Sequence, residues 1–321
     1  MAEHQTLKPG LLCKTVHRFP LPTWIENIAV RSNGDLLLTL LTKPEVYLVK
    51  PSDPSNAVLV HYFDDATALA GIIEVAEDMF YVGGGKFNAK TNQSVSGSFK
   101  VWEIDMRDFV AGTAAPARVL VDLKDVGLPN GFELLSKEAG TILVADSSLG
   151  CVWKVNVNEE SVEKLIEVDE MKPPPPPVMQ MGVNGLAVRD GYLYWSNTTK
   201  SLFCRIKIDD NGAPSGALVE VLESGVVIDD FCFDGFGNAW VAQHMMNTVG
   251  VIRAKGGVVT VAGSADQLTV AGGAACQFGR MQEDESVLYV VTTGGLSAPV
   301  DGSQVEGGKF VAIETRGRAV F

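Results

Sequence analysis

Short apolar runs recur along the chain about every 45–55 residues, and each is followed, after a polar turn, by a second apolar run. In the first copy, residues 24–30 precede an Asn33-Gly34-Asp35 turn, and residues 36–39 form the second run. Later copies begin near residues 71, 128, 182, 228 and 274. Runs of about four to eight apolar or alternating residues between Gly, Asp, Asn and Pro predict β-strands. A repeat of this length made of short strands is typical of the blades of a β-propeller.

The pattern predicts an all-β fold in which residues 1–321 form a single six-bladed β-propeller domain. The sixth copy supplies only three strands before the chain ends, and an incomplete ring would leave an open sheet edge. Residues 13–19 alternate in polarity and precede the first copy, so we expect this N-terminal strand to close the sixth blade. Residues 159–170 suit a short helix by composition, and they suit a strand equally well.

Charge and hydropathy exclude several classes of partner. The net charge is −13 and no cluster of Lys and Arg exists, which argues against binding to nucleic acid or to an anionic membrane surface. No run of about 18 apolar residues is present, so no transmembrane helix is expected. The five cysteines are scattered without Cys-x-x-Cys spacing, which argues against a zinc site. Four of them lie in apolar strand contexts, where a free Cys acts as a small core residue, and this indicates a reducing compartment. With no signal peptide visible, we expect a cytoplasmic protein.

Candidate site residues follow from the geometry of a propeller, in which the starts of the inner strands meet at one end of a central channel. The turns between second and third strands and the loops between blades lie at the same end. A mixed wall of this kind suits a small, largely apolar ligand. The substrate-binding residues predicted on this basis are Trp24, Phe87, Asn88, Ser147, Asn184, Asn197, Thr198, Gln243, Met245 and Thr293.

His244 and Lys86 are the candidate catalytic residues in these turns. An imidazole titrates near neutral pH and serves as a general acid or base, although a turn histidine bonded to water is the alternative. Lys86 follows Gly83-Gly84-Gly85, which lacks the phosphate-loop pattern, and we interpret this segment as a flexible turn. No Gly-x-Ser-x-Gly elbow is present, so a serine hydrolase has little support.

Five consecutive prolines at residues 173–177 predict an extended polyproline II segment just before the fourth copy. The segment is either a stiff connection between blades or a rim over the channel mouth. In the second case Met179 and Met181 would offer adaptable apolar contacts to a ligand.

The order and spacing of several motifs resemble those of the SMP-30/gluconolactonase-like six-bladed propellers. The motifs are Glu26 at the first inner strand, Pro129-Asn130-Gly131 at the third, and Asp229 with Asp234-Gly235-x-Gly237-Asn238 at the fifth. In that family a Glu, two Asn and an Asp hold a divalent cation, and the Asp acts as base in lactone hydrolysis. The resemblance therefore implies Glu26, Asn130 and Asp229 as ligands of Ca²⁺ or Mg²⁺, with Asp229 also catalytic.

The second copy departs from this family pattern, because Leu69-Ala70-Gly71 has no side-chain oxygen where the family has an Asn. Asn184 in the fourth copy offers a further amide. Ca²⁺ usually takes about six to eight oxygen ligands, so two carboxylates and two amides would need water and suitable geometry. The alternative is that these side chains cap strand starts and bond to the backbone.

Residues 24–34 and 182–186 are similar to a subset of these propellers from fungal natural-product gene clusters. Some members of the subset are hetero-Diels–Alderases, which join a reactive quinone methide to a terpene alkene. The resemblance implies a cyclase that requires no cofactor and whose partners are small-molecule substrates. Such an enzyme holds two reactants together and polarises one carbonyl with a hydrogen bond, here from Lys86, His244 or an Asn.

Two other functions stay open. A divalent-metal-dependent lactonase would use the cation to polarise a carbonyl and Asp229 to activate water. A binding propeller without catalytic activity would use the proline tract and the outer faces of the blades for interactions. The cyclase is favoured because one ligand of the family metal site is missing and because the residues expected at the channel mouth are rich in apolar side chains. The sequence identifies neither the substrates nor the oligomeric state.

Overall fold

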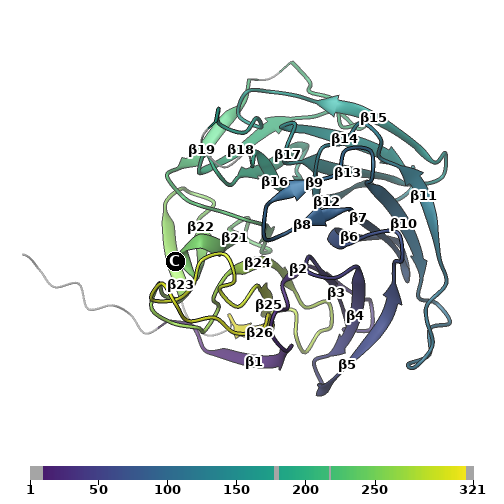
Figure 1. Cartoon of the computed structure of the whole chain (residues 1–321). Helices are drawn as coiled ribbons and strands as arrows, with labels where there is room; N and C mark the ends of the chain where they lie inside the picture. Colours follow the sequence, from purple (N-terminus) through teal and green to yellow (C-terminus); the bar gives the residue numbers. More distant parts are fainter. Residues whose placement is uncertain (1–9, 177–180, 217, 316–321) are drawn as a thin grey trace, which may run out of the picture.

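The computed structural model describes residues 10–176, 181–216 and 218–315. Six four-stranded antiparallel sheets are arranged in a ring (Figure 1). Within the described residues, the only helical element is the short 3₁₀-helix η1 (His244–Met246). The expected all-β propeller with six blades is therefore confirmed.

In blades one to five the strands follow one another along the chain, and the first inner strand of each blade contacts those of its neighbours. Blade one contains β2 (Ile25–Val30), β3 (Leu36–Leu40), β4 (Glu45–Lys50) and β5 (Asp53–Tyr62). Blade two contains β6 (Ala68–Ala76), β7 (Met79–Gly85), β10 (Lys100–Asp105) and β11 (Ala117–Asp122). Blade three contains β12 (Pro129–Ser136), β13 (Thr141–Asp146), β14 (Cys151–Asn156) and β15 (Ser161–Ile166).

The second half of the ring repeats this arrangement. Blade four contains β16 (Val183–Arg189), β17 (Tyr192–Asn197), β18 (Leu202–Lys207) and β19 (Glu220–Ser224). Blade five contains β20 (Phe231–Phe233), β21 (Ala239–Gln243), β22 (Thr248–Ile252) and β23 (Val258–Gly263). Blade six contains β24 (Gly273–Phe278), β25 (Val287–Thr292), β26 (Lys309–Glu314) and the N-terminal β1 (Cys13–Arg18). A separate small hairpin, β8 (Phe87–Asn88) and β9 (Gln93–Ser94), is inserted in blade two.

The ring is closed by the pairing of β1 with β26, as expected from the missing fourth strand. The antiparallel register runs from Cys13 opposite Ile313 to Arg18 opposite Lys309. Figure 1 shows β1, in purple, lying against the C-terminal strand β26 in yellow. Strands from the two ends of the chain therefore complete the same sheet, and no open edge is left on β26.

The hydrophobic core lies between neighbouring blades. One cluster, for example, combines Leu37 of β3 with Val82 of β7 and Trp102 of β10, all of them buried. Because each sheet buries its faces against the next, the burial of apolar area stabilises the whole ring rather than single blades. The inner strands are thus held on a rigid frame, and their first residues are fixed relative to one another.

The structure corrects the interpretation of residues 83–85 and decides between helix and strand for residues 159–170. Residues 83–85 are not a flexible turn but the end of β7, and the prediction was wrong. Their small size is required by packing, because a Cβ at Gly83 would lie 2.4 Å from the ring of Phe132. Residues 159–170, for which helix and strand stayed open, contain strand β15.

All five cysteines are free, as expected from their spacing. In the described part of the chain, no helix combines the length and the apolar character that crossing a bilayer requires.

Candidate active site

The starts of the inner strands surround a cavity of about 210 Å³. Glu26 of β2, Ala70 of β6, Asn130 of β12 and Asn184 of β16 all line it, and Asp229 enters from the loop just before β20. The inner-strand starts of five separate blades therefore meet at one site, which is the convergence that the propeller geometry predicts.

The wall of the cavity is largely apolar. Part of it comes from the β8–β9 hairpin, which contributes Phe87, Ala89 and Asn92, and Figure 1 shows this hairpin near the centre of the ring. The other apolar residues of the wall are Trp24, Leu41, Leu128, Pro129, Met181 and Met245. A small cavity with aromatic and thioether walls and a few polar groups is suited to an apolar ligand held in one orientation.

The polar groups of the cavity are joined by hydrogen bonds centred on Asp229. Asn184 Nδ2 donates to Oδ1 of Asp229 at 2.5 Å and lies 3.0 Å from Thr198 Oγ1. His244 Nδ1 lies 2.8 Å from Oδ2 of Asp229, and the other ring nitrogen lies 2.5 Å from Ser297 Oγ. Both oxygens of the Asp229 carboxylate therefore have partners, and the imidazole ring has one partner on each nitrogen.

The carboxyl group of Glu26 has a different environment. It is 8% exposed, and Trp24 Nε1 donates a hydrogen bond of 2.5 Å to its Oε2. Burial, together with the nearby negative charge of Asp229, raises the pKa of Glu26 to about 8. The raised pKa favours the protonated form of Glu26, and a neutral carboxyl group is able to donate a hydrogen bond.

His244 is positioned by the short helix η1, which directly follows β21. The helix ends at Asn247, whose φ of 56° places it in the left-handed region. The side chain of Asn247 accepts a hydrogen bond of 2.8 Å from the backbone N–H of Gly272 and lies 3.4 Å from Ala298 O. The Trp24 ring lies 5.0 Å from the His244 ring, centroid to centroid. The imidazole, 6% exposed, is therefore held from several sides.

The residues implied as metal ligands do not fit a hard cation. Asp229 uses both oxygens in short hydrogen bonds, and Asn184 directs its nitrogen, not its oxygen, at this carboxylate. At the start of the inner strand of blade two, the cavity is lined by Ala70, which has no side-chain oxygen. In the described parts of the chain, no group of three His, Cys, Asp or Glu side chains has a metal-binding arrangement. The donor set thus falls short of the about six oxygen ligands that Ca²⁺ or Mg²⁺ takes.

Most of the residues predicted from the sequence lie around this one cavity. The predicted site residues that line it are Trp24, Glu26, Phe87, Asn130, Asn184, Thr198, Asp229, His244 and Met245. Met181, one of the two methionines expected at a rim after the proline tract, also lines it, whereas Met179 falls outside the described residues.

Two predicted residues are fully buried and bond to other buried groups instead of lining the cavity. Ser147 is fully buried, donates a hydrogen bond of 2.7 Å to Val183 O and accepts one from the side chain of Asn130. Asn197, also fully buried, donates to the backbone oxygens of Glu170 and Lys172. Both side chains satisfy buried polar groups of the loops, which is the usual role of a buried hydroxyl or amide.

The remaining four predicted residues do not line the cavity. Lys86 and Asn88 are exposed, and Asn88 accepts hydrogen bonds from backbone N–H groups of the following turn. Gln243 accepts a hydrogen bond of 3.0 Å from Thr248 Oγ1, and Thr293 is fully buried. Lys86 therefore does not contact the cavity, and the prediction that it donates a hydrogen bond to a substrate there is not supported.

Ser297 is the functional candidate that sequence reasoning missed. It lies in the connection between β25 and β26, which opens at the same end of the channel as the inner-strand starts. The sequence did offer a signal, because Thr293, four residues before Ser297 in this connection, was among the predicted substrate-binding residues. The residues of the β8–β9 hairpin beyond Asn88 were missed in the same way.

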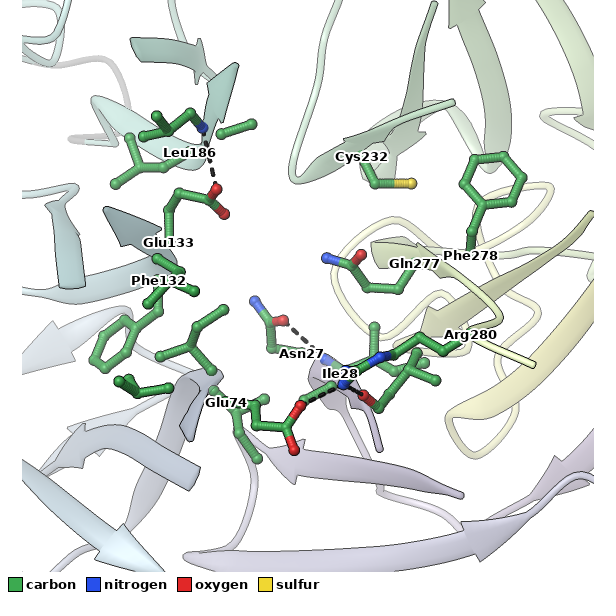
Figure 2. A pocket seen from close by; sticks show the side chains of 18 of the residues that line it. Asn27, Ile28, Glu74, Phe132, Glu133, Leu186, Cys232, Gln277, Phe278 and Arg280 are labelled. Atoms are coloured by element: carbon green, nitrogen blue, oxygen red, sulfur yellow. Dashed lines mark hydrogen bonds and ion pairs between the residues drawn. The ribbon is translucent and has the colours of Figure 1, made fainter. Parts of the chain in front are cut away.

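A second, larger cavity of about 750 Å³ lies at the opposite ends of the inner strands (Figure 2). Both acidic and basic side chains line it: Glu133 accepts a hydrogen bond of 3.1 Å from Val188 N, and Glu74 pairs with Arg280. Asp230 accepts hydrogen bonds from Asn27 Nδ2 and the Phe231 N–H. Burial raises the pKa of Glu133 to about 8 and that of Asp230 to about 7. The described residues that line this cavity include no histidine, so the smaller cavity is the better candidate for chemistry.

Glu133→Gln is expected to raise the melting temperature at pH 8 by about 2–4 °C and to change it little at pH 4. The raised pKa means that folded Glu133 keeps its proton up to about pH 8, while the unfolded chain loses it near pH 4. The wild type therefore loses stability as the pH rises between these values, and a neutral Gln does not. Thermal unfolding of wild type, Glu133→Gln and the exposed control Glu138→Gln across this range tests this; parallel curves for all three would contradict it.

Solved structures of low sequence identity share this fold. Regucalcin, a calcium-binding protein from Agrobacterium tumefaciens, is 15% identical, with a TM-score of 0.66 over 96% of both chains. A luciferin-regenerating enzyme is 14% identical, with a TM-score of 0.69 over 96% of both chains. A gluconolactonase from Xanthomonas campestris is 14% identical, with a TM-score of 0.59 over 94% of this chain and 89% of its own. These likenesses confirm the fold alone.

Curated sequences give the closer relationship, whereas no protein-family model matches the chain. A protein of a Phoma species named "Putative hetero-Diels-Alderase" is 31% identical over 309 residues, which cover 88% of this chain and 86% of the relative. A second protein, from Sarocladium schorii and named "Putative hetero-Diels-Alderase asR5", is 27% identical over 312 residues, 86% of this chain and 77% of the relative. Identity of this level along nearly the whole propeller shows that the chain belongs to the hetero-Diels–Alderase family.

Proposed function

We propose that this chain catalyses a hetero-Diels–Alder reaction, or a closely related ring closure, between two small apolar intermediates of secondary metabolism. Membership of the family supports this function, and the observation that carries it is the cavity itself. An apolar wall contributed by Trp24, Phe87 and Met245 faces a small group of hydrogen-bonded polar side chains. A quinone methide and a terpene alkene are the reactants that the sequence resemblance favours.

A cycloaddition needs positioning more than chemistry supplied by the protein. When the protein holds two reactants in a near-attack geometry, the entropic cost of bringing them together is met on binding. This lowers the activation barrier by up to about 7–11 kcal/mol. A hydrogen bond to the carbonyl oxygen of the heterodiene then withdraws electron density from the diene. The protonated carboxyl group of Glu26 and the amide of Asn130 are the donors that line the cavity beside the apolar wall.

We propose further that no cation takes part in this reaction. Both oxygens of Asp229 are hydrogen-bonded to Asn184 and His244, so the side chains that would have to bind the cation of a metal-dependent lactonase are not arranged as its ligands. The metal-dependent lactonase therefore has less support from the site than the cyclase.

The defining assay incubates the full chain with a quinone-methide precursor and an alkene such as humulene, with and without EDTA. One stereoisomer is expected to dominate, because both reactants are held in a fixed orientation, and the rate is expected to be unchanged by EDTA. Product yield and isomer ratio are measured by chromatography against a protein-free control. The proposal is wrong if the ratio equals that of the control over a panel of such pairs while simple lactones are hydrolysed in a metal-dependent manner.

We place the reaction in a reducing compartment such as the cytoplasm. The free state of all five cysteines supports this placement. Small molecules are the partners that we propose, and the net charge of −13 argues against nucleic acid as a further one.

A further inference from the structure

Three side chains at the cavity form a continuous chain of hydrogen bonds. Oδ2 of Asp229 lies 2.8 Å from Nδ1 of His244, and Nε2 of the same ring lies 2.5 Å from Ser297 Oγ. A hydroxyl, an imidazole and a carboxylate in this order are the groups by which a histidine activates a serine for nucleophilic attack. We propose that Ser297 is a nucleophile that takes the acyl group of small, uncharged carboxylic esters, with His244 as general base and Asp229 as its orienting carboxylate.

The hydrogen-bond partners define where the protons lie. A carboxylate only accepts, so Nδ1 of His244 carries the hydrogen that it donates to Asp229. In the neutral ring with this tautomer, Nε2 is the acceptor and faces the hydroxyl group of Ser297, as a general base must. Asn184 holds the other carboxylate oxygen at 2.5 Å, which prevents Asp229 from turning away from the imidazole. The ring of His244 is thus oriented before any substrate arrives.

The loop that carries Ser297 is built into the propeller. Gly294 has a φ of 69°, and a Cβ there would lie 2.0 Å from the backbone oxygen of Glu306, so the loop closes tightly at this point. The N–H of Glu306 donates a hydrogen bond of 2.9 Å to Gly294 O. On the other side, Asn247, which ends the helix that carries His244, contacts the backbone oxygen of Ala298. The serine and the histidine are therefore connected through a common anchor, while the Ser297 side chain stays accessible to solvent.

The cavity beside Ser297 defines the class of ester. Trp24 and Met245 line the cavity, so the acyl group that it accepts is apolar. None of the described residues that line the cavity is Lys or Arg, while Glu26 and Asp229 bring carboxyl groups. An anionic acyl group would meet no cationic partner, so the site favours uncharged apolar esters.

The reaction balances without any further reagent. Ser297 Oγ bonds to the carbonyl carbon of the ester, and its proton moves to Nε2 of His244. The bond between that carbon and the alkoxy oxygen breaks, and the leaving alcohol takes the proton from Nε2. A water molecule then attacks the acyl-serine while His244 again accepts and returns a proton, which releases the carboxylic acid and restores Ser297.

Covalent labelling tests the nucleophile directly. The full chain is treated with an alkyl fluorophosphonate and with p-nitrophenyl butyrate; the adduct is located by peptide mass mapping, and p-nitrophenol release is followed in time. One phosphonate per chain is expected on Ser297, with a burst of about one equivalent of p-nitrophenol. Ser297→Ala should abolish both, and His244→Ala should slow labelling by about 100-fold or more. The matched control Ser303→Ala changes an exposed serine of the same connection and should label like the wild type.

An adduct on another residue, no adduct at all, or equal labelling rates in wild type and His244→Ala would overturn the proposal. Mapping of the wild-type adduct needs no variant, so a variant that fails to fold does not weaken the test. The assay contains no ring-closing substrate. A protein that closes rings but resists the phosphonate, or the reverse, therefore separates this inference from the proposed cyclase function.

Discussion

Ala70→Phe is expected to lower the rate of ring closure by about 100-fold or more while the propeller stays folded. Ala70 lies near the start of β6, the inner strand of blade two, and it lines the active-site cavity. A benzyl group at this position would occupy much of a space of about 210 Å³ in which two reactants must lie side by side. Displacement of the reactants by about 1 Å is enough for an effect of this size, because positioning supplies most of the catalysis.

The fold should tolerate the substitution because the new side chain enters the cavity and not the core between blades. The backbone around it is also anchored, since Thr39 Oγ1 donates a hydrogen bond of 2.6 Å to Ala70 O. The measurement is the initial rate together with the isomer ratio of the product, with circular dichroism as the folding check. Ala111→Phe, in an exposed loop of the same blade, is the matched control. A folded Ala70→Phe protein of wild-type rate would show that the reaction takes place elsewhere.

Removal of a single polar side chain from the cavity is expected to reduce the rate of ring closure no more than Ala70→Phe does. His244→Ala removes one hydrogen-bonding group from the cavity, a loss on the order of 1–3 kcal/mol. If positioning dominates, the filled cavity should therefore cost at least as much as the loss of any single polar group. This comparison between Ala70→Phe and His244→Ala distinguishes catalysis by proximity from catalysis by one indispensable residue.

The ring and most of its site could be predicted from the sequence because both depend on periodic features. Strand alternation and turn residues recur in every blade, so six copies reinforce one interpretation. Glu26, Asn130 and Asp229 stand at equivalent positions of their repeats, and equivalent positions of a propeller meet at the channel. The closing strand was predictable for the same reason, since three strands in the last copy required a fourth from elsewhere.

Features without a repeat could not be predicted. Strands β8 and β9 have two residues each, too few for alternation to be visible, although their hairpin supplies part of the cavity wall. A run of three glycines at residues 83–85 is compatible both with a flexible turn and with close packing, such as that of Gly83 against Phe132. Ser147 and Asn197 stand at the correct end of their strands, but buried polar groups nearby hold their side chains. Contacts of this kind depend on rotamers, which no spacing rule determines.

The hydrogen-bonded group of Asp229, His244 and Ser297 could not be predicted from the sequence either. A search for a nucleophile elbow depends on local spacing, and these three residues come from three separate segments of the chain. Only the meeting of blades five and six brings them within hydrogen-bonding distance. A constellation of this kind is recognised by geometry and roles rather than by sequence order.

Deletion of residues 1–18 is expected to prevent stable folding, or to lower the melting temperature by about 10 °C or more and cause aggregation. The deletion removes all of β1 and leaves the backbone groups of β26 unpaired along a whole edge. Two anchors beside this strand are lost or weakened: buried Leu11, whose N–H donates a hydrogen bond of 2.8 Å to Val261 O, and buried Phe19, bonded at 3.0 Å to Gly308 O. An exposed edge of this kind is a template for pairing with another chain.

The control is deletion of residues 1–9, which retains Leu11, β1 and all their described contacts and should melt like the full chain. The decisive experiment adds a synthetic peptide of residues 10–20 to the protein that lacks residues 1–18. If the lost strand acts by closing the sheet, the peptide should add to the edge of β26 and restore the melting temperature in proportion to the logarithm of its concentration. A soluble monomer without residues 1–18 that melts at the wild-type temperature would show that blade six is stable with three strands. It would also show that the two ends of the chain need not meet for the inner strands to surround the cavity.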